Sequence, residues 1–132
     1  MRCVFDSNIF ISALILPGGK ADDAVVRIID GKAALIISNE IIDEVLTVLA
    51  RKFSKDAEAL SRVAVNLAGM GELVRPVEIL SVLEDQSDNR ILECAVTGNA
   101  EAIVTGDKAM LMLKKYRRIK MISLGEFLVL TG

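Results

Sequence analysis

Short apolar segments of strand type alternate along this chain with amphipathic segments of helix type, and this alternation restricts the fold more than any other feature. Strands are expected at residues 3–6, 34–37, 72–76, 102–104 and 119–122. Helices are expected between and after them, at residues 9–16, 21–30, 39–52, 56–68, 87–97, 107–115 and 124–130. Because parallel strands need a crossover connection, usually a helix, the sequence predicts a three-layer α/β/α fold with a roughly five-stranded parallel sheet.

The chain has no repeat, linker or low-complexity stretch, so we expect a single domain over residues 1–132. Hydrophobic residues make up 52% of it, enough to form a core at this length. We find neither a signal-like N-terminal segment nor an apolar run of membrane length. Cys3 and Cys94 stand in apolar segments, so we expect a cytoplasmic protein with reduced, buried cysteines, a disulfide being the alternative.

The absence of histidine restricts the chemistry. It excludes Ser-His-Asp and Cys-His catalysis and the usual zinc sites. The formal net charge of −2 gives no sign of nucleic-acid binding, so a polyanion would have to meet a local basic patch. Any reaction must therefore use carboxylates, hydroxyl groups, Lys, Arg or a bound metal ion.

Three acidic residues stand near the carboxyl ends of expected strands, where ligands bind in open parallel sheets. Asp6 is placed as the last residue of the first strand, with Ser7 and Asn8 available to cap the helix that follows. Asp107 follows the fourth strand, and Asp88 lies in the first turn of the helix at residues 87–97. Each of the three could instead serve only as a cap or first-turn acid of its helix.

Helical periodicity distinguishes two of the acids. Asp88 continues the apolar stripe of its helix, and a carboxylate directed toward a core is costly unless it is paired or binds a metal. Glu44 lies at the border of the buried face of the helix at residues 39–52, closer to that face than Glu40. The alternative is that Glu44 is an ordinary rim residue.

Together, the four carboxylates of Asp6, Glu44, Asp88 and Asp107 would repel one another unless a divalent cation neutralised them. Ligand sets made only of oxygen favour Mg²⁺ or Mn²⁺. One or two such ions would activate water and stabilise charge on a phosphate. The four acids therefore predict metal-dependent phosphodiester hydrolysis.

The segments around these acids resemble the PIN-domain nucleases, particularly the VapC-like toxins of prokaryotic toxin–antitoxin pairs. The matching segments are Val4-Phe5-Asp6-Ser7-Asn8, Glu44-Val45-Leu46, and residues 85–95 and 103–107. Their order and spacing hold from residue 1 to about residue 127.

The resemblance implies an endoribonuclease that depends on Mg²⁺ or Mn²⁺ and uses the same four acids as catalytic and metal-binding residues. It adds three secondary polar residues, which are Asn8, Asp85 and Thr105. It also implies an RNA substrate, an antitoxin protein as a possible partner, and a homodimer.

Basic residues provide candidate contacts to substrate phosphates. The candidates are Lys108, Lys114 and Lys115, with Arg117, Arg118 and Lys120 nearby, and Arg51, Lys52 and Lys55 form a second group. Each of these residues could equally be a solvated helix end or loop rim.

Three other functions are alternatives on the sequence alone. A phosphohydrolase with a covalent aspartate, of the haloacid-dehalogenase type, would carry a second Asp where this chain has Asn8. A phosphoaccepting receiver domain needs an acceptor Asp after the third strand, where residues 74–76 offer none. A catalytically silent PIN-like module that binds RNA or a partner would keep the fold without cleavage.

Overall fold

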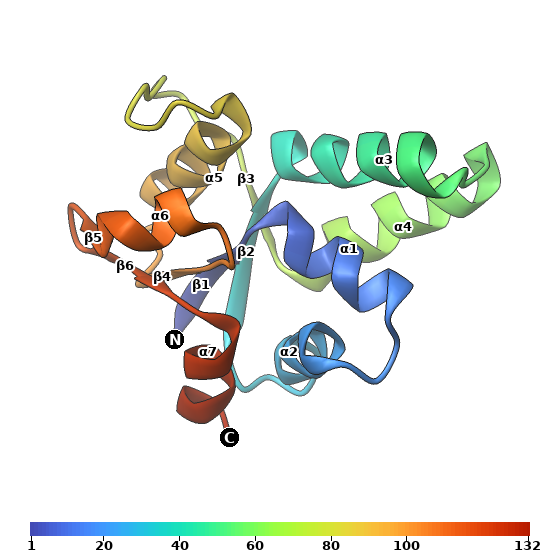
Figure 1. Cartoon of the computed structure of the whole chain (residues 1–132), viewed down its shortest axis with the longest axis horizontal. Coiled ribbons are helices and arrows are strands. Elements are labelled where there is room, and N and C mark those ends of the chain that lie inside the picture. The colour runs from blue at the N-terminus through green and yellow to red at the C-terminus, as the bar shows by residue number, and fades with distance from the viewer.

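The computed structural model describes all 132 residues as a sheet with helices on both faces (Figure 1). The strands are β1 (Arg2–Phe5), β2 (Ala34–Ser38), β3 (Glu72–Val74), β4 (Ala102–Val104), β5 (Lys115–Tyr116) and β6 (Ile119–Ile122). The helices are α1 (Ser7–Ile15), α2 (Lys20–Ile29), α3 (Asn39–Phe53), α4 (Ala57–Met70), α5 (Gln86–Thr97), α6 (Lys108–Leu113) and α7 (Leu124–Leu130). None of these helices has both the length and the apolar character needed to span a membrane.

The six strands lie in the order β3-β2-β1-β4-β6-β5, and all are parallel except β5, which pairs antiparallel with β6. From β1 the chain moves outward to β2 and β3, and it then returns to β4 and β6 on the other side of β1. With right-handed crossovers, α1 to α4 cover one face and α5 and α6 the other, so the expected three-layer α/β/α architecture is confirmed. The strand order switches between β1 and β4, the point at which such sheets bind ligands.

One edge of the sheet differs from the expectation. The sequence predicts that the helix after Asp107 continues to Lys115. This prediction is wrong, because α6 ends at Leu113 and Lys114 has a positive φ of 60°. Lys115 and Tyr116 instead form β5, across a turn in which Arg117 has a φ of 55°. Neither turn position carries the Gly or Asn that usually marks a left-handed residue, so the sequence pattern does not reveal the hairpin.

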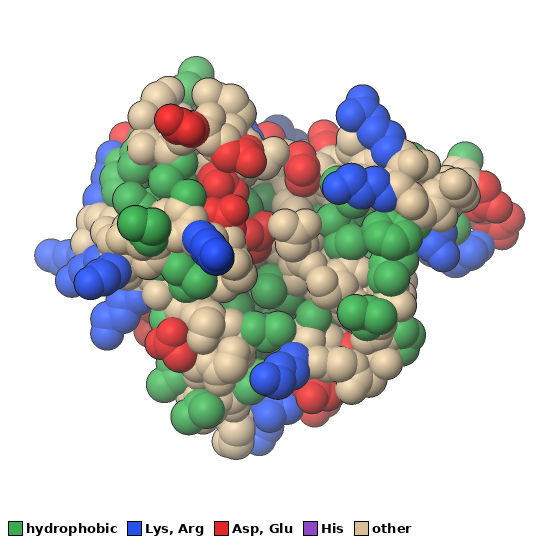
Figure 2. All heavy atoms as spheres, viewed as in Figure 1, with side chains coloured by type: hydrophobic (Ala, Val, Ile, Leu, Met, Phe, Trp, Pro, Cys, Tyr) green, Lys and Arg blue, Asp and Glu red, His purple; other side chains and the backbone are tan.

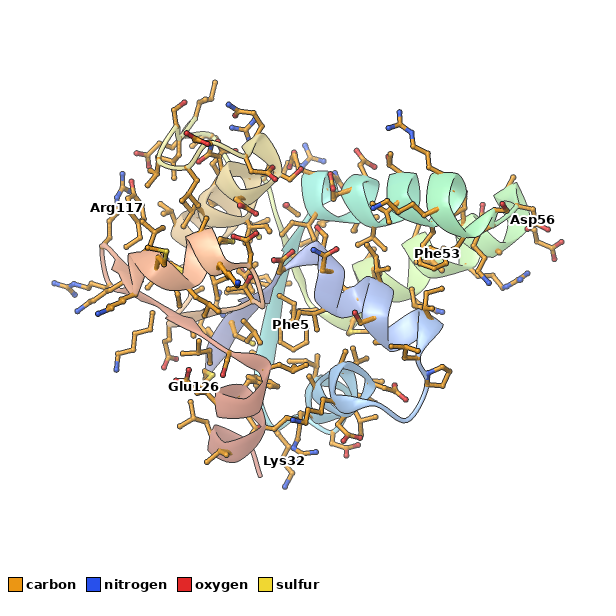
Figure 3. The ribbon with its side chains drawn as sticks, in the orientation of Figure 1. Phe5, Lys32, Phe53, Asp56, Arg117 and Glu126 are labelled. Carbon is orange, nitrogen blue, oxygen red and sulfur yellow. The ribbon has the colours of Figure 1, made fainter.

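The core is centred on Phe5, which lies in the middle of the molecule (Figure 3). Its ring packs against those of Phe10 and Phe127, with centroids 5.6 and 5.2 Å away. Cys3 and Cys94 are both buried and free, which confirms that expectation. Burial raises the pKa of each thiol to about 12, so neither is a reactive thiolate at neutral pH.

The segment at residues 75–85, between β3 and α5, has no regular structure, and side chains of α5 hold it. The Oδ1 atom of Asn89, a fully buried residue, accepts the N–H groups of Val82 and Leu83 at 3.1 and 2.9 Å. The Nδ2 atom of Asn89 donates to the carbonyl of Leu83 at 2.8 Å. The carboxylate of Glu93 accepts a further backbone N–H of this segment at 2.8 Å. These bonds fix the chain immediately before the acids of α5.

We expect Asn89→Ala to lower the free energy of unfolding by about 2–3 kcal/mol, because it removes a fully buried side chain that makes three hydrogen bonds to the backbone of this segment. Urea denaturation measures this effect as a shift in the midpoint of unfolding, with the dependence of the free energy of unfolding on urea concentration unchanged. Asn66→Ala on the exposed face of α4 is the control and should change stability by less than about 0.5 kcal/mol. Equal effects of the two substitutions would show that Asn89 does not hold the segment.

Candidate active site

The acidic residues come together at the carboxyl edge of the sheet, beside the switch in strand order. Phe5 pairs with Val104, so the chain segments that leave β1 and β4 emerge side by side. The N–H of Asp6 also donates to the carbonyl of Val104 at 3.0 Å. In Figure 2, acidic side chains gather in the hollow between the part of the molecule with α5 and α6 and the part with α1 and α3.

Asp6 is buried, with an exposed fraction of 4%, and its two carboxylate oxygens have different partners. Oδ1 accepts the N–H of Asn8 at 3.2 Å, and Oδ2 accepts the hydroxyl of Thr105 at 2.7 Å. Burial raises the pKa of Asp6, these two hydrogen bonds oppose that shift, and the charges of Asp107 and Asp85 add to it. Thr105, which is fully buried, also accepts the N–H of Asp107 at 3.0 Å, so one hydroxyl connects two of the four acids.

The expected role of the residues around Asp6 needs a correction. The sequence predicts Asp6 as the last residue of the first strand, with Ser7 or Asn8 as the helix cap. In the structure β1 ends at Phe5 and Asp6 itself is the N-cap of α1, while Ser7 is its first residue. The buried Asp carboxylate outcompetes its neighbours for the free N–H groups of the first turn, because a charged acceptor binds them more strongly. Capping and a role in the site are therefore not alternatives for this residue.

Asp88 is also buried, with an exposed fraction of 6%, in the first turn of α5. Its carboxylate makes no hydrogen bond and no ion pair with any side chain. Burial, followed by the charges of Asp107, Asp85, Asp6 and Glu44, raises its pKa to about 7. The carboxylate of Asp88 therefore lies within electrostatic range of the other four carboxylates.

Glu44 is half-buried on α3 and faces α5. Its Oε2 accepts the hydroxyl of Ser87 at 3.0 Å. The N-cap of α5 is Asp85, which accepts the N–H of Ser87 at 2.8 Å, so the Ser87 hydroxyl is free to reach Glu44. The Ser87 contact depends on how α3 packs against α5, so no pattern within one helix predicts it. Asp107 is the N-cap of α6 and accepts the N–H of Met110 at 3.0 Å.

No Lys or Arg neutralises this group of acids. The ion pairs of the structure lie elsewhere, and they are Arg2–Glu72, Arg62–Glu58, Arg90–Glu93 and Arg117–Glu78. The donor set consists only of oxygen, which fits a hard divalent cation such as Mg²⁺ or Mn²⁺. In this conformation no three of the side chains are close enough to share one ion. Binding would therefore require side-chain rotation, which Asp88 is free to make because it has no hydrogen bond to break.

The remaining candidate residues do not all lie at the acids. Asn8 is exposed on the first turn of α1, and Lys108 is exposed on the first residue of α6, directly after Asp107. Lys114 and Lys115 lie beyond the other end of α6, about 9 Å further along its axis at 1.5 Å per residue. The structure therefore brings Lys108 to the site and leaves Lys114 and Lys115 at the opposite end of the helix.

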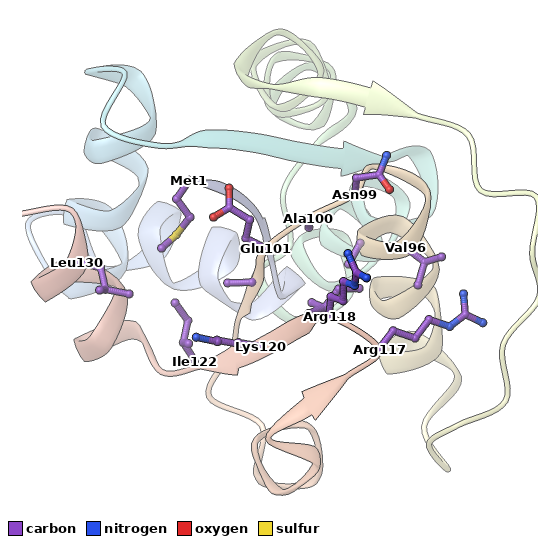
Figure 4. Close-up of a pocket in the computed structure, with 13 residues that line it drawn as sticks. Met1, Val96, Asn99, Ala100, Glu101, Arg117, Arg118, Lys120, Ile122 and Leu130 are labelled. Atoms are coloured by element: carbon purple, nitrogen blue, oxygen red, sulfur yellow. The ribbon is translucent and has the colours of Figure 1, made fainter.

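A second feature, a cavity on the other side of the molecule, is distant from the acids. It measures about 860 Å³ and opens near the amino ends of β1, β4 and β6 (Figure 4). Arg117, Arg118 and Lys120 contribute to its lining together with apolar side chains. The basic residues that follow β5 in sequence thus belong to this hollow and not to the acidic edge.

Comparison with known proteins agrees with this arrangement. Residues 2–109 match the PIN domain family. Over 131 residues the chain is 28% identical to the uncharacterized protein MJ1680 of Methanocaldococcus jannaschii, covering 94% of this chain and 84% of that protein. This chain therefore belongs to the PIN domain family, and the resemblance seen in the sequence is confirmed.

Two solved structures share the fold. One is VapBC2 from Rickettsia felis bound to a DNA fragment from their promoter, with a TM-score of 0.64 and 14% identity over 93% of this chain and 98% of the other. The second is VapBC-1 from nontypeable Haemophilus influenzae, with a TM-score of 0.63 and 15% identity over 95% and 99% of the two chains. Membership in the PIN domain family sets aside the haloacid-dehalogenase and receiver alternatives.

Proposed function

We propose that this chain is a metal-dependent endoribonuclease, with Asp6, Glu44, Asp88 and Asp107 as its catalytic and metal-binding acids. One observation supports the proposal most strongly: Asp88 is a buried residue whose carboxylate has no hydrogen bond or ion pair within the protein and lies near other carboxylates. Such a group destabilises the metal-free fold. A divalent cation would turn this repulsion into attraction, and no residue of the chain supplies that charge.

Each side chain of the site would have a distinct role in binding the metal ion and the substrate. Thr105 and the N–H of Asn8 fix both oxygens of Asp6, and Ser87 directs Glu44 toward α5. Asp88 has no such restraint and can turn toward a bound ion. Bound divalent cations lower the pKa of water to near neutrality and stabilise charge on a phosphate. Lys108, exposed beside Asp107, would contact a phosphate of the substrate.

The wider biological role is also part of the proposal. The resemblance to VapC-like toxins, together with the fold shared with the two VapBC structures, supports a toxin that pairs with an antitoxin protein. We further propose that the protein is a cytoplasmic homodimer and consists of a single domain. Asn8 and Asp85 would assist the four acids as polar neighbours.

Cleavage assays test the function. Purified protein is incubated with structured RNAs and with matched DNAs in Mg²⁺, in Mn²⁺ and in EDTA, beside an Asp6→Asn variant. We expect RNA cleavage that needs metal, returns when Mn²⁺ replaces EDTA, and is lost in the variant. Cleavage in EDTA, or equal cleavage by Asp6→Asn, would overturn the proposal. Metal-bound protein that retains RNA without cutting it would favour the silent binding module.

We expect Thr105→Val to reduce metal affinity or activity by about 10- to 100-fold, the usual effect of removing a group that orients a metal ligand. The substitution keeps the shape of the buried side chain and removes the hydroxyl that Asp6 accepts at 2.7 Å. Initial cleavage rates over a range of Mn²⁺ concentrations measure the effect.

Thr131→Val provides the control, because Thr131 is also buried and donates to the carbonyl of Phe127 at 2.7 Å, far along the chain from the acids. It should leave the Mn²⁺ dependence unchanged. The same rates at every Mn²⁺ concentration for both variants would show that Thr105 has no part in the site.

A further inference from the structure

A small polar cavity lies directly beside the acids, between the first turns of α3 and α5. Its volume is about 140 Å³, room for about five waters at ~30 Å³ each or for one flat heterocycle. It shares Glu44 and Ser87 with the acidic site, and only one of its lining residues is apolar. The lining residues are Ser7, Glu40, Ile41, Glu44, Gln86, Ser87 and Arg90.

Several of these groups already have partners, which limits what a ligand can use. Glu44 accepts the hydroxyl of Ser87 at 3.0 Å. The guanidinium of Arg90 pairs with Glu93 at 2.9 Å and donates to the carbonyl of Leu80 at 3.3 Å. These contacts hold Arg90 in place beside the cavity, and a guanidinium plane is a surface on which a base can stack.

Two polar groups of the cavity remain available. The Oε1 of Gln86 accepts from Asn89 and Arg90, both at 3.4 Å, so its Nε2 is left as a donor without a partner. The carboxylate of Glu40 makes no hydrogen bond and no ion pair, and it is exposed at the rim. The cavity therefore presents the Glu40 carboxylate, which can accept two hydrogen bonds, and the Gln86 Nε2, which can donate one.

This pattern matches one nucleobase better than the others. Guanine carries two adjacent N–H donors, at N1 and N2, beside the O6 acceptor. A carboxylate can accept both N–H groups while an amide donates to O6. Adenine, cytosine and uracil each lack a second adjacent ring-edge donor, so they would form fewer hydrogen bonds with Glu40 and Gln86 than guanine does.

We propose that this cavity binds the base of a nucleotide next to the scissile phosphate and selects guanine through Glu40 and Gln86, with Arg90 stacking on the ring. The proposal rests on the function proposed above, because the cavity adjoins the cleavage site. Single-stranded RNA is read in this way, by stacking and by hydrogen bonds to splayed base edges. Glu40, Gln86 and Arg90 are not among the four proposed metal-binding acids, so base binding can be measured in EDTA without cleavage.

The first test titrates 5′-GMP, AMP, CMP and UMP into the full-length protein in EDTA, followed by NMR or calorimetry. We expect GMP to bind at least about tenfold more tightly than the others, the discrimination of one good bidentate pair. Glu40→Gln should remove that difference. Asp43→Asn makes a similar charge change on the exposed side of α3 and should preserve it. Equal binding of the four nucleotides, or a preference for GMP that survives Glu40→Gln, would overturn the proposal.

The second test maps cleavage sites in a pool of random-sequence RNA with Mn²⁺. Guanine should be enriched next to the cut for the wild type and for Asp43→Asn, and the enrichment should fall at least about fivefold in Glu40→Gln. Metal-dependent cleavage without such a preference would overturn the base pocket and leave the proposed nuclease intact. If no RNA is cut, the nuclease proposal fails, and the GMP titration still decides whether the cavity binds guanine.

Discussion

Replacing Asp88 with asparagine should abolish RNA cleavage and at the same time stabilise the metal-free protein. The loss of a charged metal ligand removes several kcal/mol of transition-state stabilisation, so we expect a decrease of at least about a thousandfold in rate. The free energy of unfolding of the metal-free protein should increase, because the variant removes a buried carboxylate that is repelled by its neighbours. A gain of about 1 kcal/mol corresponds to a Tm increase of roughly 4 °C in a domain of this size.

The cleavage rate should fall while the stability of the metal-free protein rises, and this combination distinguishes a metal ligand from a structural residue. Cleavage rates in Mn²⁺ and thermal melts in EDTA at pH 8 measure them. Asp43→Asn, which changes an exposed acid on α3, should alter neither quantity appreciably. If Asp88→Asn loses both activity and stability, Asp88 is a structural residue of α5, and its unpaired state does not mark a metal site.

The second large effect concerns pH and metal in the wild type. In the folded protein the pKa of Asp88 is raised from 3.8 to about 7, so between those values the folded state holds a proton that the unfolded state has released. The free energy of unfolding contributed by this group therefore falls as pH rises from about 4 to about 7 and is constant above that. We expect the metal-free wild type to lose stability over this window relative to Asp88→Asn.

Divalent metal should reverse the loss at pH 7.5. A ligand at a hundred times its Kd stabilises the folded state by about 2.7 kcal/mol, and Mn²⁺ should do so for the wild type and much less for Asp88→Asn. Thermal melts at pH 5, 6, 7 and 8, with EDTA and with Mn²⁺, provide the data. Parallel pH profiles for the two proteins would mean that Asp88 ionises normally in the folded state.

The sequence predicted the layers of this fold because each strand and helix carries its own periodic pattern, and parallel pairing follows from their alternation. It predicted that Asp6 and Asp107 meet because both follow strands at one edge, and β1 and β4 do pair. It also predicted a buried Asp88 from the apolar stripe of a single helix. These inferences need only local patterns and the general rules of parallel sheets.

The remaining features depend on contacts between elements. The hydroxyl of Ser87 reaches Glu44 only because α3 packs against α5. β5 depends on left-handed backbone at Lys114 and Arg117, residue types that seldom adopt it. The position of Lys115 followed from that unexpected turn, so its proposed contact with substrate phosphates at the acids loses its structural support.

If the carboxylates at the switch point bind a divalent cation, anomalous diffraction should locate that ion. Crystals would be soaked in Mn²⁺ at a concentration that supports cleavage, and data collected near the manganese edge. We predict an anomalous peak bounded by oxygens of Asp6, Asp88 and Asp107 at about 2 Å, absent in crystals of Asp88→Asn. The absence of a peak at this edge of the sheet, or a peak that persists in the variant, would show that Asp88 and its neighbours do not form a metal site.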